Sequence, residues 1–124
     1  RMKTLGDLET RIMEILWRRD EPTTVRKVHE ELDRARPLAY TTIMTVMDRL
    51  WRKRLLRRTL RGRAFEYVPA ASQAEYTAKL MHQLLRGTGD RQGALAHFVR
   101  GMRKADEAEL LRLAREATRR KRTR

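Results

Sequence analysis

A chain of 124 residues has room for one ordinary domain, or for a compact head with a small appendage, but not for two large independent cores. Its 40% hydrophobic content with only 6 Gly and 3 Pro predicts a folded, mainly helical protein, and the absence of Cys excludes disulfides, thiol nucleophiles and thiolate metal sites. Thirty Lys and Arg against 16 Asp and Glu leave a net charge of +14, which favours a polyanionic partner, either nucleic acid or anionic lipid.

The hydropathy pattern argues against a membrane protein. No apolar run reaches the roughly 18 residues that a membrane span needs. Charged residues also interrupt the segment from Arg1 to Leu16, unlike the core of a signal peptide. We therefore expect a soluble, cytoplasmic protein.

Two amphipathic helices are predicted in the first part of the chain. From Gly6 to Arg19, apolar residues recur at spacings of three and four, which places them on one helix face. Asp20, Glu21 and Pro22 break this helix, and either Thr23 or Thr24 can cap a second one that ends at Arg36 and Pro37. The two apolar stripes are Leu5, Leu8, Ile12, Ile15 and Leu16, then Val25, Val28 and Leu32.

A third helix is predicted from about Tyr40 to Lys53. Ile43, Val46, Met47 and Leu50 form its apolar face. The opposite face carries Thr41, Thr45, Asp48 and Arg52. This outer face has no core to meet, so it is free to contact a partner.

A β-hairpin with a basic tip follows the third helix. The runs 56–60 and 64–68 are rich in β-branched, aromatic and Leu residues, and Arg61, Gly62 and Arg63 separate them. Phe65 and Tyr67 share one face, which we expect to pack inward. Trp51 could pack under the hairpin or lie near a bound nucleic acid, and the sequence does not decide between these.

Three helices followed by a basic hairpin make the plan of a winged helix-turn-helix. Between Arg49 and Arg63 there are eight Lys or Arg and no Asp or Glu, so the positive charge gathers on the end of the third helix and on the hairpin. The major groove of DNA admits one α-helix, and short Thr side chains let its backbone come close to the bases. Each feature alone would suit a solvated surface, but the set favours DNA binding. The predicted DNA contacts are Tyr40, Thr41, Thr42, Thr45, Arg49, Arg52, Arg61 and Arg63.

The second part of the chain predicts three short helices and no strand. Ser72 with Glu75, and Asp106 with Glu109, have the spacing of a capping box and mark two helix starts. Gly87 and Gly89 end the first of these helices. The apolar positions of the three helices are Tyr76, Leu80, Leu84, Leu95, Phe98, Val99, Met102, Leu110, Leu113, Ala114 and Ala117.

Such short helices cannot bury their stripes well by themselves, so pairing with a second copy of the chain is the economical arrangement. The alternative is that they pack back on the head of a monomer. We predict a winged-helix DNA-binding domain at residues 1–70 and a helical dimerisation domain at residues 71–124, with interface residues Tyr76, Leu80, Leu84, Leu95, Phe98, Leu110 and Leu113. The basic segment from Arg119 to Arg124 is interpreted as a frayed tail.

No catalytic or cofactor site is indicated. His29 and Asp33 stand four residues apart on a helix, but two ligands make a poor metal site. His82 and His97 have no Ser or Cys partner in the pattern. Gly87-Thr-Gly89 lacks the preceding strand and third glycine of a dinucleotide site. We expect no enzymatic activity, no cofactor and no small-molecule ligand.

Three stretches closely resemble the penicillinase and methicillin-resistance repressors. They are PLAYTTIMTVMDRL at 37–50, LLRR at 55–58 and GRAFEYVP at 62–69. Residues 5–17 and 25–32 are also similar to the first two helices of that family. The resemblance implies a homodimer that represses resistance genes at a palindromic operator with TACA/TGTA-like half-sites. By position, it assigns operator reading to Tyr40, Thr41, Thr42 and Thr45.

The resemblance also implies a route of release. Members of the family are inactivated by proteolysis at an Asn-Phe bond in the middle C-terminal helix, in response to a membrane antibiotic sensor. The matching bond here joins His97 to Phe98, so His replaces Asn. The copper-responsive branch of the family carries C-terminal cysteines, and this chain has none. Copper sensing is therefore not expected.

Two other classes of function are compatible with a basic chain of this kind. A non-specific architectural protein would bind any duplex equally, and an RNA-binding protein would expose aromatic stacking surfaces. An enzyme would need a polar site that the sequence does not show. We rank the operator-binding repressor first, the non-specific nucleic-acid binder second and the enzyme third.

Overall fold

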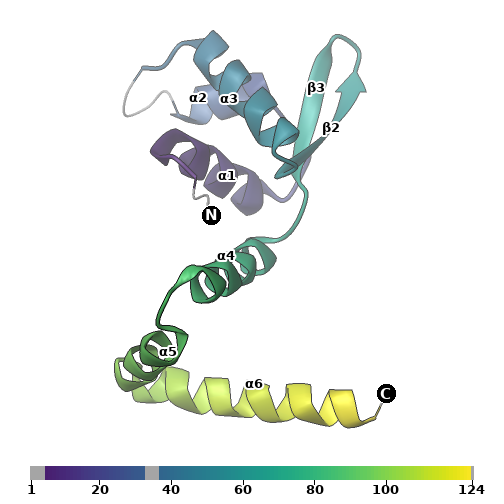
Figure 1. Ribbon diagram of the computed structural model, residues 1–124. Helices are drawn as coiled ribbons and strands as arrows, with labels where there is room; N and C mark the ends of the chain where they lie inside the picture. The colour runs from purple at the N-terminus through teal and green to yellow at the C-terminus, as the bar shows by residue number, and fades with distance from the viewer. Residues whose placement is uncertain (1–4, 33–36, 124) are drawn as a thin grey trace. The chain divides into compact units, whose positions relative to one another are not determined.

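The computed structural model describes residues 5–32 and 37–123 of the chain. Its internal contacts divide the chain into two units, with the division between His82 and Gln83. The domain boundary predicted at residue 70 remains a prediction. The elements, labelled in Figure 1, are α1 (Asp7–Arg19), β1 (Thr23–Thr24), α2 (Val25–Leu32), α3 (Tyr40–Arg52), β2 (Leu56–Arg61), β3 (Ala64–Pro69), α4 (Gln73–Gly87), α5 (Arg91–Arg100) and α6 (Lys104–Arg122).

Helix α1 begins and ends as local chemistry dictates. Its N-cap is Gly6, whose backbone N–H donates to the Glu9 carboxylate at 3.1 Å. The acidic side chains of Asp7 and Glu9 lie in the first turn, where the helix dipole favours negative charge. The helix ends when Asp20 adopts a left-handed conformation with φ of 53°. The predicted span is thus confirmed to within one residue.

Helix α2 is capped by Thr24, one of the two residues that the sequence offered. The Thr24 hydroxyl accepts a hydrogen bond from the backbone N–H of Lys27 at 3.3 Å. Thr23 is instead fully buried in strand β1, where its hydroxyl donates to the Glu21 carbonyl at 2.8 Å. The predicted end of this helix at Arg36 lies outside the described residues.

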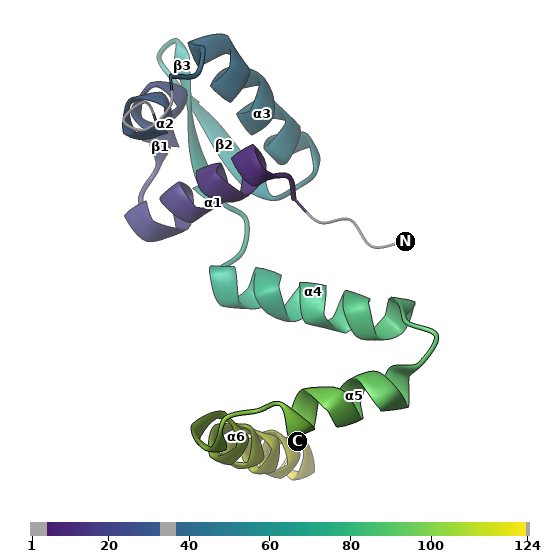
Figure 2. The ribbon, with the colours of Figure 1, turned by 90° about the vertical axis from the view of Figure 1, so that its left-hand side faces the viewer.

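Helices α1, α2 and α3 share one buried core. Figures 1 and 2 show the three helices gathered beside the small sheet. The apolar faces predicted for α2 and α3 are buried throughout. In α1, Ile12, Ile15 and Leu16 are buried as predicted and Met13 joins them, whereas Leu5 and Leu8 are only partly buried. We call residues 5–70 the head. Its buried core comprises Ile12, Met13, Ile15, Leu16, Val25, Val28, Leu32, Ile43, Val46, Met47, Leu50, Leu56 and Tyr67.

Strand β3 is the centre of a three-stranded antiparallel sheet in the order β1-β3-β2. Strands β2 and β3 form the predicted hairpin, with Arg61 opposite Ala64, so Gly62 and Arg63 make a two-residue turn. Gly62 has φ of 63°, as the first turn residue of a type II′ hairpin requires. The short strand β1 was not predicted; it pairs Thr23 with Tyr67 on the other edge of β3.

The start of α4 is fastened to the head. The predicted capping box forms: the Ser72 N–H donates to the Glu75 carboxylate at 2.9 Å, and the Glu75 N–H donates to the Ser72 hydroxyl at 3.1 Å. The Trp17 indole donates to the Ala71 carbonyl at 3.0 Å, and its ring lies 5.5 Å from that of Tyr76. Burial, helped by the nearby Glu9 carboxylate, raises the pKa of Tyr76.

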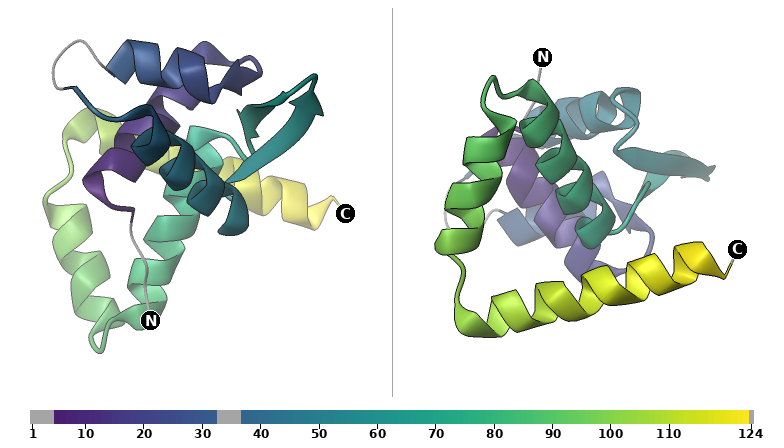
Figure 3. Two further views of the ribbon diagram at one scale, coloured as in Figure 1. Left: turned by 90° about the horizontal axis from the view of Figure 1, so that it is seen from above. Right: turned by 60° about the horizontal axis from the view of Figure 1, so that its bottom comes forward.

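Helix α6 differs from its prediction at both ends, and helix α5 has a cap that was not predicted (Figure 3). Helix α6 begins at Lys104, so the start expected at Asp106 is wrong; that carboxylate lies in the first turn and pairs with Arg103 at 3.4 Å. The tail expected from Arg119 onward is helical through Arg122, because α6 continues to that residue. Helix α5 is capped by Asp90, which the sequence analysis missed: its carboxylate accepts from the Gly93 N–H at 3.0 Å.

The C-terminal helices leave their apolar side chains uncovered. Among the described residues of α4, α5 and α6, none is buried. Leu84 and Phe98 are each 54% exposed in the single chain. The exposed large apolar side chains of this region are Met81, Leu84, Leu95, Phe98, Val99, Leu110, Leu111 and Leu113.

Candidate nucleic-acid interface

The outer face of α3 is open to solvent, as its sequence predicted. The core holds this helix through its four buried residues, and the side chains on the opposite side of its first two turns are exposed. We call the exposed residues of its first two turns the outer face of α3. They are Tyr40, Thr41, Thr42, Met44 and Thr45. Met44 is the one member of this face that the sequence analysis did not single out.

His29 holds the start of α3 in place. Its Nε2 atom lies 2.6 Å from the Leu38 carbonyl, and its ring meets that of Tyr40 edge-on at 5.8 Å. His29 thus joins α2 to the entry of α3 through both a hydrogen bond and an aromatic contact. Asp33, weighed as its partner in a metal site, lies outside the described residues.

The end of α3 carries two exposed cations. Arg49 lies close enough to α1 for its charge to lower the pKa of Glu9. Arg52 pairs with Asp48 one turn earlier at 2.8 Å and remains 72% exposed. An ion pair this exposed is weak, so Arg52 can exchange Asp48 for another anion at low cost.

Lys53, the residue after α3, ties the helix end to α1. Its ammonium group lies 2.8 Å from the Glu9 carboxylate, of which little is exposed. Burial acts to raise the pKa of Glu9, but the hydrogen bonds from Lys53 and the Gly6 N–H outweigh it and hold that pKa below its usual range. The pair fixes the direction of α3 against α1.

The hairpin tip presents Arg61 and Arg63 to solvent. Arg61 is 72% exposed and lies 3.4 Å from the Glu66 carboxylate across the hairpin. Arg63 occupies the second position of the turn, next to Gly62. Both predicted cations are therefore placed on the end of the hairpin, where they can meet a flat anionic surface.

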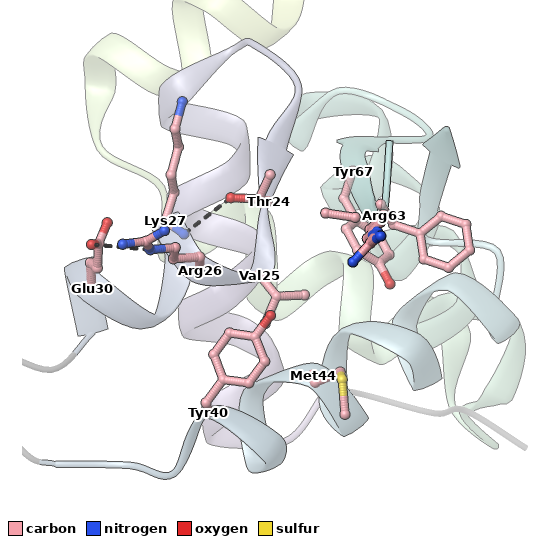
Figure 4. A pocket seen from close by; sticks show the side chains of 11 residues that line it. Thr24, Val25, Arg26, Lys27, Glu30, Tyr40, Met44, Arg63 and Tyr67 are labelled. Atoms are coloured by element: carbon pink, nitrogen blue, oxygen red, sulfur yellow. Dashed lines mark hydrogen bonds and ion pairs between the residues drawn. The ribbon is translucent and has the colours of Figure 1, made fainter. Parts of the chain in front are cut away.

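An open hollow of about 620 Å³ lies between the start of α2, the start of α3 and strand β3. Figure 4 shows Tyr40 and Met44 of α3 along one side of it, with Arg63 from the hairpin facing them beside Tyr67. Lys27 and Arg26 come from the first turn of α2, and Arg26 lies 3.9 Å from Glu30. Three cations therefore surround a hollow that adjoins the outer face of α3.

Arg58 departs from the pattern of its basic neighbours, because its side chain is only 16% exposed. Its guanidinium lies over the Trp51 ring at 3.5 Å and over the Phe65 ring at 4.0 Å. It donates to the Asp48 carboxylate at 2.8 Å and to the Tyr67 hydroxyl at 3.3 Å. The sequence did not decide where Trp51 lies. In the structure its ring packs against Arg58 of the hairpin strand β2.

The aromatic pair on β3 only half follows the prediction that both rings pack inward. Tyr67 is 2% exposed and belongs to the core, but Phe65 is 37% exposed. Phe65 stands two residues nearer the tip, beyond the edge of the core, so Arg58 covers it instead of apolar side chains. The expectation is confirmed for Tyr67 and wrong for Phe65.

The charges around Asp48 are mutually stabilising. Hydrogen bonds from Arg52 and Arg58 hold the pKa of Asp48 below its usual range. Burial acts to lower the pKa of Arg58, but its hydrogen bonds to Tyr67 and Asp48 raise it overall. Asp48 is the single carboxylate between Tyr40 and Arg63.

Within residues 5–32 and 37–123, no three His, Cys, Asp or Glu side chains gather as they would around a metal ion. None of the described helices is both long enough and apolar enough to cross a membrane.

Comparison with known proteins points in one direction. The family model of the penicillinase repressor matches residues 5–118. The transcriptional regulator BlaI of Mycobacterium tuberculosis is 47% identical over 117 residues, which cover 92% of this chain and 84% of that protein. The penicillinase repressor of Bacillus licheniformis is 28% identical over 81 residues, or 65% of this chain and 62% of that protein.

A solved structure agrees with the sequence comparison. The DNA-binding domain of the repressor BlaI superimposes with a TM-score of 0.52 at 26% identity, covering 61% of this chain and 92% of that one. The resemblance inferred from the motifs, and the mainly helical winged fold, are thereby confirmed. The chain belongs to the penicillinase repressor family.

Proposed function

We propose that this chain is a transcriptional repressor that binds a palindromic DNA operator as a homodimer. The observation that carries the proposal is the outer face of α3, a Thr-rich surface held rigidly by the core and flanked by the basic tip of the hairpin. A face of this width suits the major groove, while the tip suits the adjoining phosphates. Such a repressor acts in the cytoplasm, where bacterial DNA lies.

In this proposal the predicted contacts divide into two kinds. Tyr40, Thr41, Thr42 and Thr45 face the base edges, where hydroxyls can bond to bases and Thr methyl groups can pack on thymine. The exposed cations meet phosphates, which fix the position of the protein but carry no sequence information. These cations are Arg49, Arg52, Arg61 and Arg63.

Substitutions that separate the two kinds of contact test the DNA-binding proposal. Thr45→Val keeps the shape of the side chain and removes its hydroxyl, so operator binding falls by about 1–3 kcal/mol while binding to a scrambled duplex changes little. Arg63→Gln is the matched control, because loss of a phosphate contact weakens both duplexes alike. Binding is measured by titration at fixed salt with an operator selected from a random pool.

Two outcomes would contradict this assignment. If Thr45→Val lowered the affinity for the operator and for the scrambled duplex equally, Thr45 would not read base edges. A wild-type protein that binds the scrambled duplex as tightly as the selected one would instead favour a non-specific architectural protein.

The homodimer is supported by the uncovered apolar side chains of α4, α5 and α6. Eight large apolar side chains between Met81 and Leu113 are exposed in the single chain. A second copy of the same helices is the occupant that matches them, because it offers the same apolar stripes and most soluble oligomers are symmetric pairs. Two heads related by a twofold axis then meet half-sites about one helical turn, or a multiple of it, apart.

We propose further that a cut at His97–Phe98 releases the repressor. Phe98 on α5 is exposed in the single chain, so a protease can reach this bond when the two copies separate. The cut separates Leu84 and Leu95 from Leu110 and Leu113, which divides the apolar surface of the dimer between two fragments. A monomeric head keeps its outer face of α3 but loses the second half-site, and with it an avidity that can exceed about a hundredfold.

A full-length variant with a specific protease site introduced at residues 97 and 98 tests this release. Once cut, it is expected to sediment as a monomer and to bind the operator about a hundredfold less tightly than the same variant left uncut. A cut protein that stays dimeric and keeps its affinity would refute the release mechanism, though not operator binding.

The regulated genes are proposed from the relatives. One of them is named a penicillinase repressor, so the corresponding target for this chain is a β-lactam resistance gene. Mapping the DNA bound in cells, with β-lactamase transcript levels measured with and without the repressor, tests this target. Bound sites that lie only at unrelated genes would reject it.

A further inference from the structure

We propose that Arg58 is a positioning residue that fixes the hairpin against α3, and that it does not contact DNA. The proposal rests on the DNA-binding function above. It separates Arg58 from the other basic residues between Arg49 and Arg63, which the sequence alone makes equivalent.

Three elements meet at the Arg58 guanidinium. Arg58 lies on β2, and its guanidinium carbon lies over Trp51 at the end of α3 and over Phe65 on β3, at 3.5 and 4.0 Å from the ring centroids. Its edge donates to Asp48 of α3 at 2.8 Å and to Tyr67 of β3 at 3.3 Å. Both strands of the hairpin are thereby joined to the side of α3.

The chemistry of the site requires arginine. A guanidinium is planar, so it can stack between two rings and still donate from its edge, whereas the round ammonium of lysine cannot do both. Arg58 is 16% exposed, against 72% for Arg52 and Arg61, so little of its side chain is open to a phosphate. The site is built to hold Arg58 in place.

The consequence concerns how the two parts of the DNA interface act together. The outer face of α3 and the hairpin tip contact one duplex at the same time only if the hairpin keeps its angle to α3. When the Arg58 contacts are removed, the part of the hairpin beyond the buried Leu56 and Tyr67 loses these contacts with α3, and binding must restore its position at an entropic cost. Arg58 therefore contributes to operator affinity through Trp51 and Asp48.

Arg58→Lys in the full-length protein separates positioning from a phosphate contact, because the charge is kept. Positioning predicts operator binding about tenfold weaker for Arg58→Lys, of the order of a lost cation–π contact that is partly buried. A phosphate contact predicts near-wild-type binding, as expected for the control Arg63→Lys. Binding of both variants is measured by titration against the selected operator and a scrambled duplex.

Arg58→Gln tests the salt dependence of operator affinity, which reports phosphate contacts. Loss of a phosphate contact lowers the slope of log affinity against log salt by about 0.9 per contact, as expected for the control Arg63→Gln. Positioning predicts an unchanged slope for Arg58→Gln. A slope lowered as much as in the control would overturn the proposal.

A spectroscopic signature in the wild-type protein makes the test independent of whether the variants fold. The Arg58 guanidinium lies over the Trp51 and Phe65 rings. Ring currents are therefore expected to shift the resonance of its side-chain N–H strongly upfield in the DNA-free protein. The shift should persist when the operator binds. An unshifted resonance, or one that moves to the position of a phosphate-bound guanidinium on binding, would overturn the proposal.

Failure of the two proposals can be told apart. A wild-type protein that does not distinguish the operator from a scrambled duplex contradicts the repressor function. The ring-current shift of Arg58 in the free protein tests the positioning contact by itself.

Discussion

Helices α1 to α3 of the head and helices α4 to α6 have the same apolar periodicity, but only the helices of the head bury their apolar faces within the chain. In the head, the stripes of α1, α2 and α3 face one another and close a core that includes Leu16, Met47 and Leu50, each 0% exposed. In α4, α5 and α6, stripes of similar composition remain uncovered. Periodicity therefore predicts that a helix has an apolar face, while the rest of the fold decides whether that face is covered within the chain or by a second molecule.

The largest effect is expected in the head. Leu50→Ala opens a cavity in a fully buried site and should lower the free energy of unfolding by about 2–5 kcal/mol. Urea denaturation at several protein concentrations measures it, and the loss should be the same at each concentration. If the loss disappeared at high protein concentration, the head core would depend on association and the contrast between the two regions would fail.

Leu113→Ala on α6 tests the other side of the comparison. It should weaken self-association by about 1.5–3 kcal/mol per chain, because a large side chain leaves the proposed interface. Sedimentation over a range of concentrations measures the dissociation constant. Leu60→Ala, at an exposed apolar position on the hairpin, is the control and should leave association unchanged. Equal effects of the two substitutions would mean that exposure alone does not identify the interface.

A substitution at Gly62 tests whether the hairpin turn of the head has a fixed backbone conformation. Gly62→Ala places a side chain at φ of 63°, where no atom lies within 4 Å, so its cost is conformational and should be about 1–2 kcal/mol. Gly89→Ala, which also meets nothing within 4 Å and has no positive φ, is the control with little expected change. Thermal unfolding monitored at the hairpin compares them. A neutral Gly62→Ala would mean that the turn adapts without strain.

The smallest effect concerns the Glu9–Lys53 pair. Because the pKa of Glu9 is lower in the folded protein than its ordinary 4.5, the pair stabilises the fold above that pH and the contribution is lost as pH falls through the folded pKa. Glu9→Gln should therefore cost about 1 kcal/mol at neutral pH and progressively less in acid. Urea midpoints across the acid range measure this, with Glu14→Gln on the solvent side of α1 as control. A difference that grows in acid would contradict the sign.

Local signals predicted most of the head, and non-local contacts account for what they missed. The spans of α1 and α3, the Thr24 cap and the turn at Gly62 follow from spacing and single-residue preferences. Strand β1 was missed because two residues have no periodicity, and their pairing with β3 joins positions more than forty residues apart. The role of Arg58 was missed for the same reason, since Trp51, Phe65 and Asp48 reach it from other elements.

The C-terminal helices show a different limit of sequence reasoning. An acidic residue near a helix start can be the N-cap or a member of the first turn, and both stabilise the helix. Asp90 is of the first kind and Asp106 of the second, so the same residue type led to an overlooked cap and to a misplaced helix start.

The order β1-β3-β2 has a consequence for solubility. Both edges of β3 are occupied, so β2 offers the longer open edge of the sheet, and its residues include Arg57, Arg58 and Arg61. An open strand edge can join the edge of another molecule and begin aggregation, unless it is short or charged. Here β1 is short and β2 carries the exposed cations Arg57 and Arg61, so positive charge opposes the addition of another strand at this edge.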